Sequence, residues 1–273
     1  MKLHAFFLLL TILAPMPLHA APAIIGHRGA SSAAPENTLA SIREAWKQKA
    51  DGAEFDIRLT KDGKIVLMHD DTTKRTTGSQ LVVKNHSLAE LRELDAGSWK
   101  GEQWRGEPVP LLEEVLKDLP EGKIYYIEIK SGPEILPELA RLIKESGKAS
   151  DQFRIIAFDF DTLVKSESLI PTVKTLWIVD GKKDNVSGKK TYPDLAGLAD
   201  KAAGAGIEGL NLNHGFPLDE AAVKAIKAKG LSVAAWTVND PAIAKRLATA
   251  GLDALSTDLP GKIRAEMKPW DAS

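Results

Sequence analysis

Histidines stand close to other charged residues at two places in the sequence. His27 is followed directly by Arg28, and His69 comes shortly after the acidic pair Glu54 and Asp56. Imidazoles transfer protons near neutral pH, carboxylates bind hard cations, and a guanidinium group binds phosphate oxygens. If the fold brings these side chains together, they form a site able to break a phosphodiester bond by in-line displacement at phosphorus.

The acidic residues fall on one face of each of two predicted strands. Glu54 and Asp56 alternate with apolar residues in the strand Ala53–Leu59, and Glu128 has the same phase in the strand Ile124–Lys130. In a closed barrel the apolar faces pack outward on helices, so the three carboxylates are expected to point into the lumen. There they would repel one another unless a cation neutralised them, and oxygen ligands favour one Mg²⁺ or Ca²⁺ ion. The alternative is a solvent-facing polar strand or a set of structural ion pairs.

Two histidines and two cations complete the candidate site. His27 and His69 are expected to divide the roles of general base and general acid, while Arg28 and Lys130 contact the phosphate. Either cation has the alternative role of a plain ion-pair partner. The chain has no cysteine and no Gly-x-Ser-x-Gly motif, so water or a substrate hydroxyl group is the expected attacking group.

The second histidine is expected to reach the carboxylates through a β-hairpin. Lys61–Gly63 has the composition of a turn, and the strand Ile65–Met68 follows too closely for a crossover helix. The two strands are therefore expected to pair antiparallel. This pairing would set Asp56 roughly opposite His69, with both side chains on one face.

Strand and helix patterns alternate along most of the chain, which indicates a parallel α/β sheet. The stretch of about 71–110 lacks this periodicity and is expected to be a small insertion after the second histidine. About nine strand-like segments favour a (β/α)₈ TIM barrel with one extra hairpin strand over an open doubly wound sheet. The predicted strands are 24–26, 53–59, 65–68, 124–130, 153–158, 173–179, 209–212, 232–236 and 254–257, with helices after Thr38 and over 88–94, 111–119, 135–145, 161–169, 194–205, 219–229 and 241–250.

The N-terminus has the pattern of a secretory signal peptide. Lys2 precedes an apolar run, Ala5–Ala14, and small residues end at Ala20. We expect a signal peptide over 1–20 and one barrel domain over 21–273, exported to the periplasm or secreted, without a stable membrane anchor. The net charge of −1 indicates no nucleic-acid partner. The oligomeric state stays open.

Eight short motifs of this chain resemble, in the same order, those of the glycerophosphodiester phosphodiesterases. The resemblance covers essentially the whole chain after the signal peptide. It implies a (β/α)₈ barrel that hydrolyses glycerophosphodiesters to sn-glycerol 3-phosphate and an alcohol. The motifs are His27-Arg28-Gly29-Ala30, Pro35-Glu36-Asn37-Thr38, Glu54-x-Asp56, Asp62-Gly63, His69-Asp70, Glu128-x-Lys130, Trp236-Thr237-Val238-Asn239 and Thr257-Asp258-x-Pro260.

The resemblance also implies a role for each site residue. The positions that match the family's metal ligands are Glu54, Asp56 and Glu128, and those that match its acid/base pair are His27 and His69; Arg28 and Lys130 match its phosphate contacts, and Phe158 and Trp236 would wall a glycerol pocket. Two departures, Ala157-Phe158 and Pro110-Leu111-Leu112, concern substrate preference rather than reaction class.

Three other functions remain open from the sequence. A lysophospholipase D-like enzyme would act on lipids and show a wide apolar mouth rimmed by Trp99 and Trp104. A non-catalytic phosphoester-binding protein would have no use for the histidine pair, and a barrel sugar isomerase would have none for Arg28. The preferred head group, the choice between Ca²⁺ and Mg²⁺, the acid among the two histidines, and direct water attack against a cyclic phosphate are not decided.

Overall fold

A closed parallel barrel forms the centre of the protein, which is described here from a computed structural model covering residues 19–184 and 187–271. In this part of the chain eight parallel strands pair in the order β1-β11-β10-β9-β6-β5-β4-β2, and β2 closes the ring on β1. They are β1 (Ala23–Gly26), β2 (Gly52–Leu59), β4 (Ile124–Ile129), β5 (Phe153–Ala157), β6 (Lys174–Val179), β9 (Gly209–Asn213), β10 (Ser232–Trp236) and β11 (Ala254–Thr257). The predicted (β/α)₈ barrel is confirmed.

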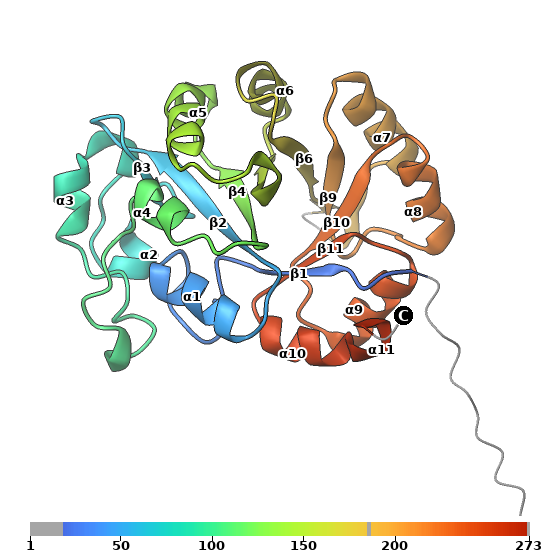
Figure 1. Cartoon of the computed structure of the whole chain (residues 1–273), viewed down its shortest axis with the longest axis horizontal. Helices are drawn as coiled ribbons and strands as arrows, with labels where there is room; N and C mark the ends of the chain where they lie inside the picture. Colours follow the sequence, from blue (N-terminus) through green and yellow to red (C-terminus); the bar gives the residue numbers. More distant parts are fainter. Residues whose placement is uncertain (1–18, 185–186, 272–273) are drawn as a thin grey trace, which may run out of the picture.

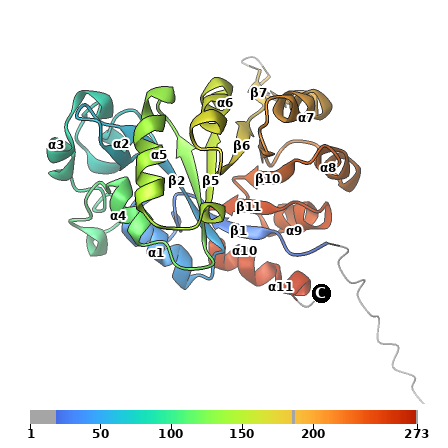
Figure 2. The ribbon, with the colours of Figure 1, turned by 45° about the horizontal axis from the view of Figure 1, so that its top comes forward.

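Helices surround the strands, as Figures 1 and 2 show. Side chains cap several of their N-termini: the Thr38 side chain accepts from the Ser41 amide, and aspartates cap some of the later helices. The helices are α1 (Leu39–Lys47), α4 (Leu112–Lys117), α5 (Leu136–Glu145), α6 (Phe160–Leu169), α7 (Leu195–Gly204), α8 (Glu220–Lys227), α9 (Pro241–Thr249), α10 (Pro260–Glu266) and α11 (Lys268–Asp271).

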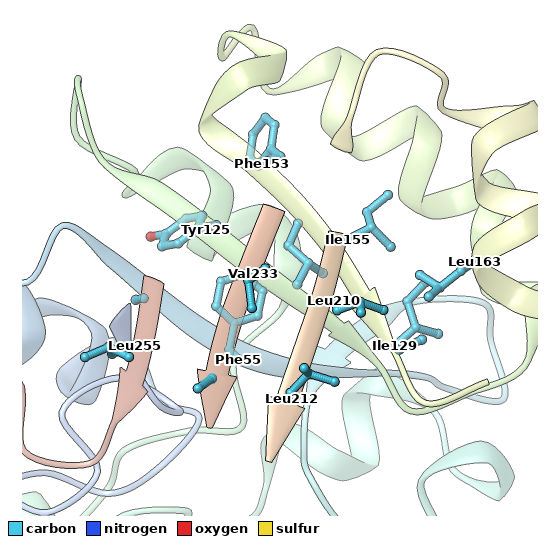
Figure 3. Packing of buried hydrophobic residues seen from close by; sticks show 14 of the residues in the cluster. Phe55, Tyr125, Ile129, Phe153, Ile155, Leu163, Leu210, Leu212, Val233 and Leu255 are labelled. Carbon is cyan, nitrogen blue, oxygen red and sulfur yellow. The ribbon is translucent and has the colours of Figure 1, made fainter. Parts of the chain in front are cut away.

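The strands bury two separate apolar surfaces because successive side chains point to opposite faces. The outward faces pack on the helices, and Figure 3 shows Phe55, Tyr125, Phe153 and Leu210 in this large cluster. The inward faces form a smaller cluster inside the barrel, made of Ile25, Tyr126, Ile156, Leu176, Ile178, Ala234 and Ala254. Side chains fill the interior of a barrel of this size, so the polar groups in it line a pocket rather than a channel.

The expected hairpin forms, but its register differs from the prediction. Strand β3 (Ile65–Leu67) pairs antiparallel with β2. The residue that faces Asp56 is Met68, whose amide donates to the Asp56 carbonyl at 3.0 Å, so the expected pairing of Asp56 with His69 is wrong by one residue. The strand ends before His69, and this histidine turns toward the site from a bend instead of from the pleat.

The segment after His69 contains short helices and a core of its own. Its elements are α2 (Lys74–Thr77), the 3-10 helix η1 (Val83–Asn85), α3 (Leu88–Arg92) and the 3-10 helix η2 (Glu102–Trp104). Val66, Val83, Leu91 and Val109 pack together in this core. A small hairpin of β7 (Lys182–Lys183) and β8 (Lys190–Thr191) was not predicted.

Two predictions for the N-terminus concern the membrane and the signal peptide. The predicted signal peptide lies outside the described residues apart from His19 and Ala20. Among the described residues, no helix has the length and apolarity needed to cross a bilayer.

We predict that Gly29 tolerates no side chain. Its φ of +80° is left-handed, and an added Cβ would overlap the backbone of Ser41 on α1, where the chain leaves β1. Gly29→Ala is therefore expected to lower the free energy of unfolding by about 3 kcal/mol or more, because strain and overpacking add. Gly63 has a similar φ of +72° with no atom within 4 Å of the added Cβ, so Gly63→Ala should cost only about 1 kcal/mol. Equal losses in urea unfolding would contradict the packing argument.

Candidate active site

Three buried carboxylates lie side by side in the upper lumen. Glu54 and Asp56 come from β2, and Glu128 comes from β4, where it pairs in register with Asp56. One oxygen from each lies within 4.8 Å of the others. Among the described residues, Glu54 Oε1 and Asp56 Oδ1 are buried and accept no hydrogen bond. Orphaned carboxylate oxygens that converge on one point fit a hard cation such as Mg²⁺ or Ca²⁺.

The protonation of the three acids reflects this crowding. Burial, together with the charges of Asp56 and Glu128, raises the pKa of Glu54 well above its usual range. Burial and the charge of Asp56 raise the pKa of Glu128 to about 7. The pKa of Asp56 is lowered, because Lys130, Arg28, His69 and Asn37 outweigh the effect of its burial. Without a cation, these interactions therefore favour the ionised form of Asp56 and the protonated forms of Glu54 and Glu128.

His27 is held by a carboxylate from the far end of the chain. Its Nδ1 lies 2.7 Å from Asp258 Oδ1, and Ser31 and Asn239 donate to the same carboxylate at 2.8 and 2.6 Å. These hydrogen bonds outweigh burial and keep the pKa of Asp258 well below its usual range. The charged acceptor keeps a proton on Nδ1, so that Nε2, 3.9 Å from Glu54 Oε2, faces the three carboxylates.

His69 has a carboxylate partner of a different kind. Its Nδ1 lies 2.7 Å from Oδ1 of Asp70, whose pKa falls to about 2 because hydrogen bonds from Arg75 and His69 outweigh burial. Burial lowers the pKa of His69 itself and outweighs the opposite effects of Asp56 and Asp70. Arg58 donates two hydrogen bonds to the His69 carbonyl and fixes its backbone. Burial therefore favours the neutral form of the ring, in which Nε2 can accept a proton.

The two predicted phosphate-binding cations lie against the acids. The Arg28 guanidinium donates to Glu36 at 2.8 Å, and its Nε lies 3.4 Å from Asp56 Oδ2. Asp56, Glu36 and Glu54 outweigh burial and raise the pKa of Arg28. Lys130 Nζ forms an ion pair with Glu128 and lies 3.3 Å from Asp56 Oδ1. Both cations are thus in place beside the acids, where an anionic ligand would find them.

A small cavity adjoins this cluster, and every predicted site residue except Asp56 lines it. Its volume is about 160 Å³, and the predicted residues in its lining are His27, Arg28, Glu54, His69, Glu128, Lys130, Phe158 and Trp236. The rings of Phe158 and Trp236 meet edge to face, with their centroids 5.5 Å apart. The structure therefore brings all nine predicted site residues into one place.

Several supporting residues were not assigned roles from the sequence. Asn37 clamps Asp56 twice, donating to Oδ2 at 2.8 Å and accepting from the Asp56 amide at 3.0 Å. Glu36, Asp70 and Arg75 form an ionic chain between Arg28 and His69. The Pro35–Thr38 and His69–Asp70 motifs signalled that these positions matter, but a motif does not show which atoms meet.

The fold and these side chains together define a barrel enzyme that hydrolyses phosphoric diesters. Residues 27–262 match the model of the Glycerophosphoryl diester phosphodiesterase family. The chain is 36% identical over 253 residues to a glycerophosphodiester phosphodiesterase of Bacillus subtilis (strain 168), covering 86% of this chain and 83% of the relative. The chain belongs to the glycerophosphoryl diester phosphodiesterase family.

Solved structures agree with this assignment. A phosphodiesterase of Oleispira antarctica, in complex with the product sn-glycerol-3-phosphate, superimposes with a TM-score of 0.80 at 31% identity, covering 90% of this chain and 97% of that chain. The glycerophosphodiester phosphodiesterase of Thermotoga maritima gives a TM-score of 0.73 at 26% identity, covering 90% and 99%.

We predict that Glu128 makes the metal-free protein less stable as the pH rises. Its folded pKa of about 7 exceeds the unfolded value, so its contribution is complete at low pH and is lost as the pH rises through about 7. The loss is roughly 3 kcal/mol in the free energy of unfolding. Glu128→Gln cannot ionise, so in a chelating buffer it should match the wild type at pH 5 and be more stable at pH 8. Urea unfolding at both pH values measures this.

The matched control for this experiment is Glu134→Gln, because Glu134 is exposed in the 3-10 helix η3 (Pro133–Ile135) that follows β4. This variant should follow the wild type at both pH values. An equal effect of Glu128→Gln at pH 5 and pH 8 would show that the Glu128 carboxyl is not under electrostatic stress.

Proposed function

We propose that this protein hydrolyses glycerophosphodiesters to sn-glycerol 3-phosphate and an alcohol, using one divalent cation and two histidines. The observation that carries the proposal is the pair of carboxylate-oriented imidazoles, His27 and His69, beside three buried acids, two of which have an oxygen that accepts no hydrogen bond. The family supports the reaction, and the product bound to the Oleispira antarctica relative is the expected phosphorylated fragment.

Glu54, Asp56 and Glu128 would hold the cation. When bound, a hard dication neutralises their charges and draws electron density from a phosphoryl oxygen. Arg28 and Lys130 lie beside the same acids, so they would contact the remaining phosphate oxygens and offset the charge that develops during displacement.

The surroundings of the two histidines support different roles. Burial lowers the pKa of His69 and favours its neutral form, so its Nε2 is the group suited to deprotonate the attacking water or substrate hydroxyl. His27, Trp99 and Lys100 line a second cavity of about 390 Å³, which would hold alcohols of different structure. We infer that the leaving alcohol occupies that cavity and takes its proton from His27 Nε2. The charged Asp258 would stabilise the imidazolium form that donates it.

The exposed apolar surface supports a water-soluble substrate over a lipid. Among the described residues, the large hydrophobic side chains that are exposed are Trp99, Phe158 and Leu169. Trp104, the second expected rim residue of a lipid-binding mouth, is only half-exposed. Three exposed side chains are too few for the broad patch that a lysophospholipase D-like enzyme would present to a micelle.

We predict that the two histidine variants separate when the leaving group is changed. His69→Ala should lower kcat/KM about 10²–10⁴-fold for both an alkyl and a p-nitrophenyl ester of glycerol phosphate. His27→Ala should cause that loss only with the alkyl alcohol, and less than about tenfold with p-nitrophenol, which leaves without protonation. Initial rates over a range of substrate concentrations measure both effects.

His86→Ala is the matched histidine control, because His86 Nδ1 pairs with the Val82 carbonyl in the segment after β3, outside the site. It should keep wild-type rates with both substrates. If the two site variants lost activity equally with both leaving groups, the division of roles would be wrong. Near-full turnover by either would remove that histidine from the mechanism.

We predict that activity and cation binding are lost together. Chelation should abolish turnover, and Mg²⁺ or Ca²⁺ should restore it, because the three acids otherwise hold Arg28 and Lys130 in ion pairs. Asp56→Asn removes a ligand charge and should weaken calorimetric cation binding by roughly 100-fold. Glu134→Gln should bind the ion as the wild type does. Full activity of chelated protein would contradict the metal-dependent mechanism.

A further inference from the structure

An asparagine without a partner lies in the wall of the small cavity, opposite the acids. Asn211 is on β9, where its neighbours in register are Ile178 on β6 and Ala234 on β10. The side chains of these two neighbours are apolar and cannot hydrogen-bond to the Asn211 side-chain amide. The side chain is 2% exposed, and its Oδ1 is buried without a hydrogen-bond partner among the described residues. A rotation of the amide exchanges its donor and acceptor, so the position can offer either.

The surroundings of Asn211 do not require it for structure. The Trp236 indole donates to the Asn211 main-chain carbonyl at 3.2 Å, so the bond that places the aromatic wall does not use the amide side chain. Ser256, which is 2% exposed, is the other small polar residue in the same cavity wall. A buried polar group is normally paired, and one left unpaired at the wall of a cavity indicates a ligand that completes it.

The chemistry of the cavity selects the kind of ligand. Aromatic rings of Phe158 and Trp236 and the side chains of Ile156 and Ile178 offer apolar contact, while Asn211 offers neutral hydrogen bonds. A short polyol has this mixture of C–H faces and hydroxyl groups. At about 160 Å³ the cavity is smaller than the roughly 300 Å³ at which pockets for drug-sized ligands begin, so it fits a three-carbon fragment and not an acyl chain.

We propose that Asn211, assisted by Ser256, binds the free hydroxyl groups of the glycerol moiety and makes the site selective for deacylated glycerophosphodiesters. This inference rests on the proposed function, because the phosphate beside Arg28 and Lys130 directs the attached glycerol into this cavity. An acyl ester on the glycerol would remove a hydroxyl donor from Asn211 and add a chain that the cavity cannot hold. Asn211 is thus a residue that determines substrate specificity.

The test compares two substrates that share a leaving group. One is the p-nitrophenyl ester of sn-glycerol 3-phosphate, and the other is propyl p-nitrophenyl phosphate, which lacks both hydroxyl groups. Asn211→Leu keeps the side-chain volume and removes the hydrogen bonds. It should lower kcat/KM for the glycerol ester by about 10–100-fold and change that for the propyl ester by less than about threefold. Its thermal midpoint should equal or exceed that of the wild type, because a buried unpaired polar group is removed.

Asn213→Ala is the matched control on the same strand. The Asn213 Oδ1 already accepts from the Gly215 amide and the Tyr192 hydroxyl, so this variant should lose stability and keep the wild-type preference between the two esters. If Asn211→Leu lowered both rates equally, or neither, the inference would be overturned. If that variant did not fold, Asn211→Ala would be used, with the same expected change in preference.

Product binding separates this inference from the proposed reaction. In the presence of Mg²⁺, calorimetry should show that the wild type binds sn-glycerol 3-phosphate at least about tenfold more tightly than propyl phosphate, and that Asn211→Leu loses the difference. Selective binding without turnover would overturn the proposed reaction and support the role of Asn211. Turnover with equal binding of the two phosphates would do the reverse.

Discussion

The structure depends on one electrostatic constraint: three carboxylates from adjacent strands share the interior of a closed barrel. Glu54, Asp56 and Glu128 are buried with their oxygens within 4.8 Å of one another. Such a group cannot be fully ionised in a medium of low polarity unless positive charge is supplied nearby. Arg28 and Lys130 supply part of that charge, and a cation held by the three acids would supply the rest.

The segment between β3 and α4 connects the two halves of the site through ion pairs. Arg75, on α2, donates to Glu36, which holds Arg28, and to Asp70, which orients His69. Glu36 keeps a lowered pKa because its hydrogen bonds to Arg75 and its charge interaction with Arg28 outweigh burial. A single side chain outside the barrel therefore fixes Arg28 and His69 relative to each other. These ion pairs give the compact segment after the second histidine, which has a core of its own, a role in the site.

The alternation of side chains allowed most of the fold and the centre of the site to be predicted. Glu54, Asp56 and Glu128 each stand between apolar residues of strands whose outward faces must be covered, and this pattern has one solution in a barrel. The pairing of Asp56 with His69 failed because a hairpin register depends on where the strand ends, and Met68 takes the facing position. If the strand had continued through His69, this shift of one residue would have pointed the histidine away from the site. His69 reaches the site because the chain bends after Leu67.

Other parts of the site depend on closure of the barrel, which local sequence patterns do not encode. His27 follows the first strand and Asp258 follows the last, 231 residues later, and they meet because β1 pairs with β11. Asn211 is comparable: within its strand it is an ordinary polar residue, and only the ring of neighbouring strands shows that its amide has no partner. Because the last strand must dock before His27 acquires its carboxylate, a chain that has folded without closing the ring has no oriented imidazole at that position. Barrel closure is therefore the step at which this sequence acquires a site with two carboxylate-oriented imidazoles. Residues that stabilise the pairing of β1 with β11 thus act on the geometry of the site without lying in it.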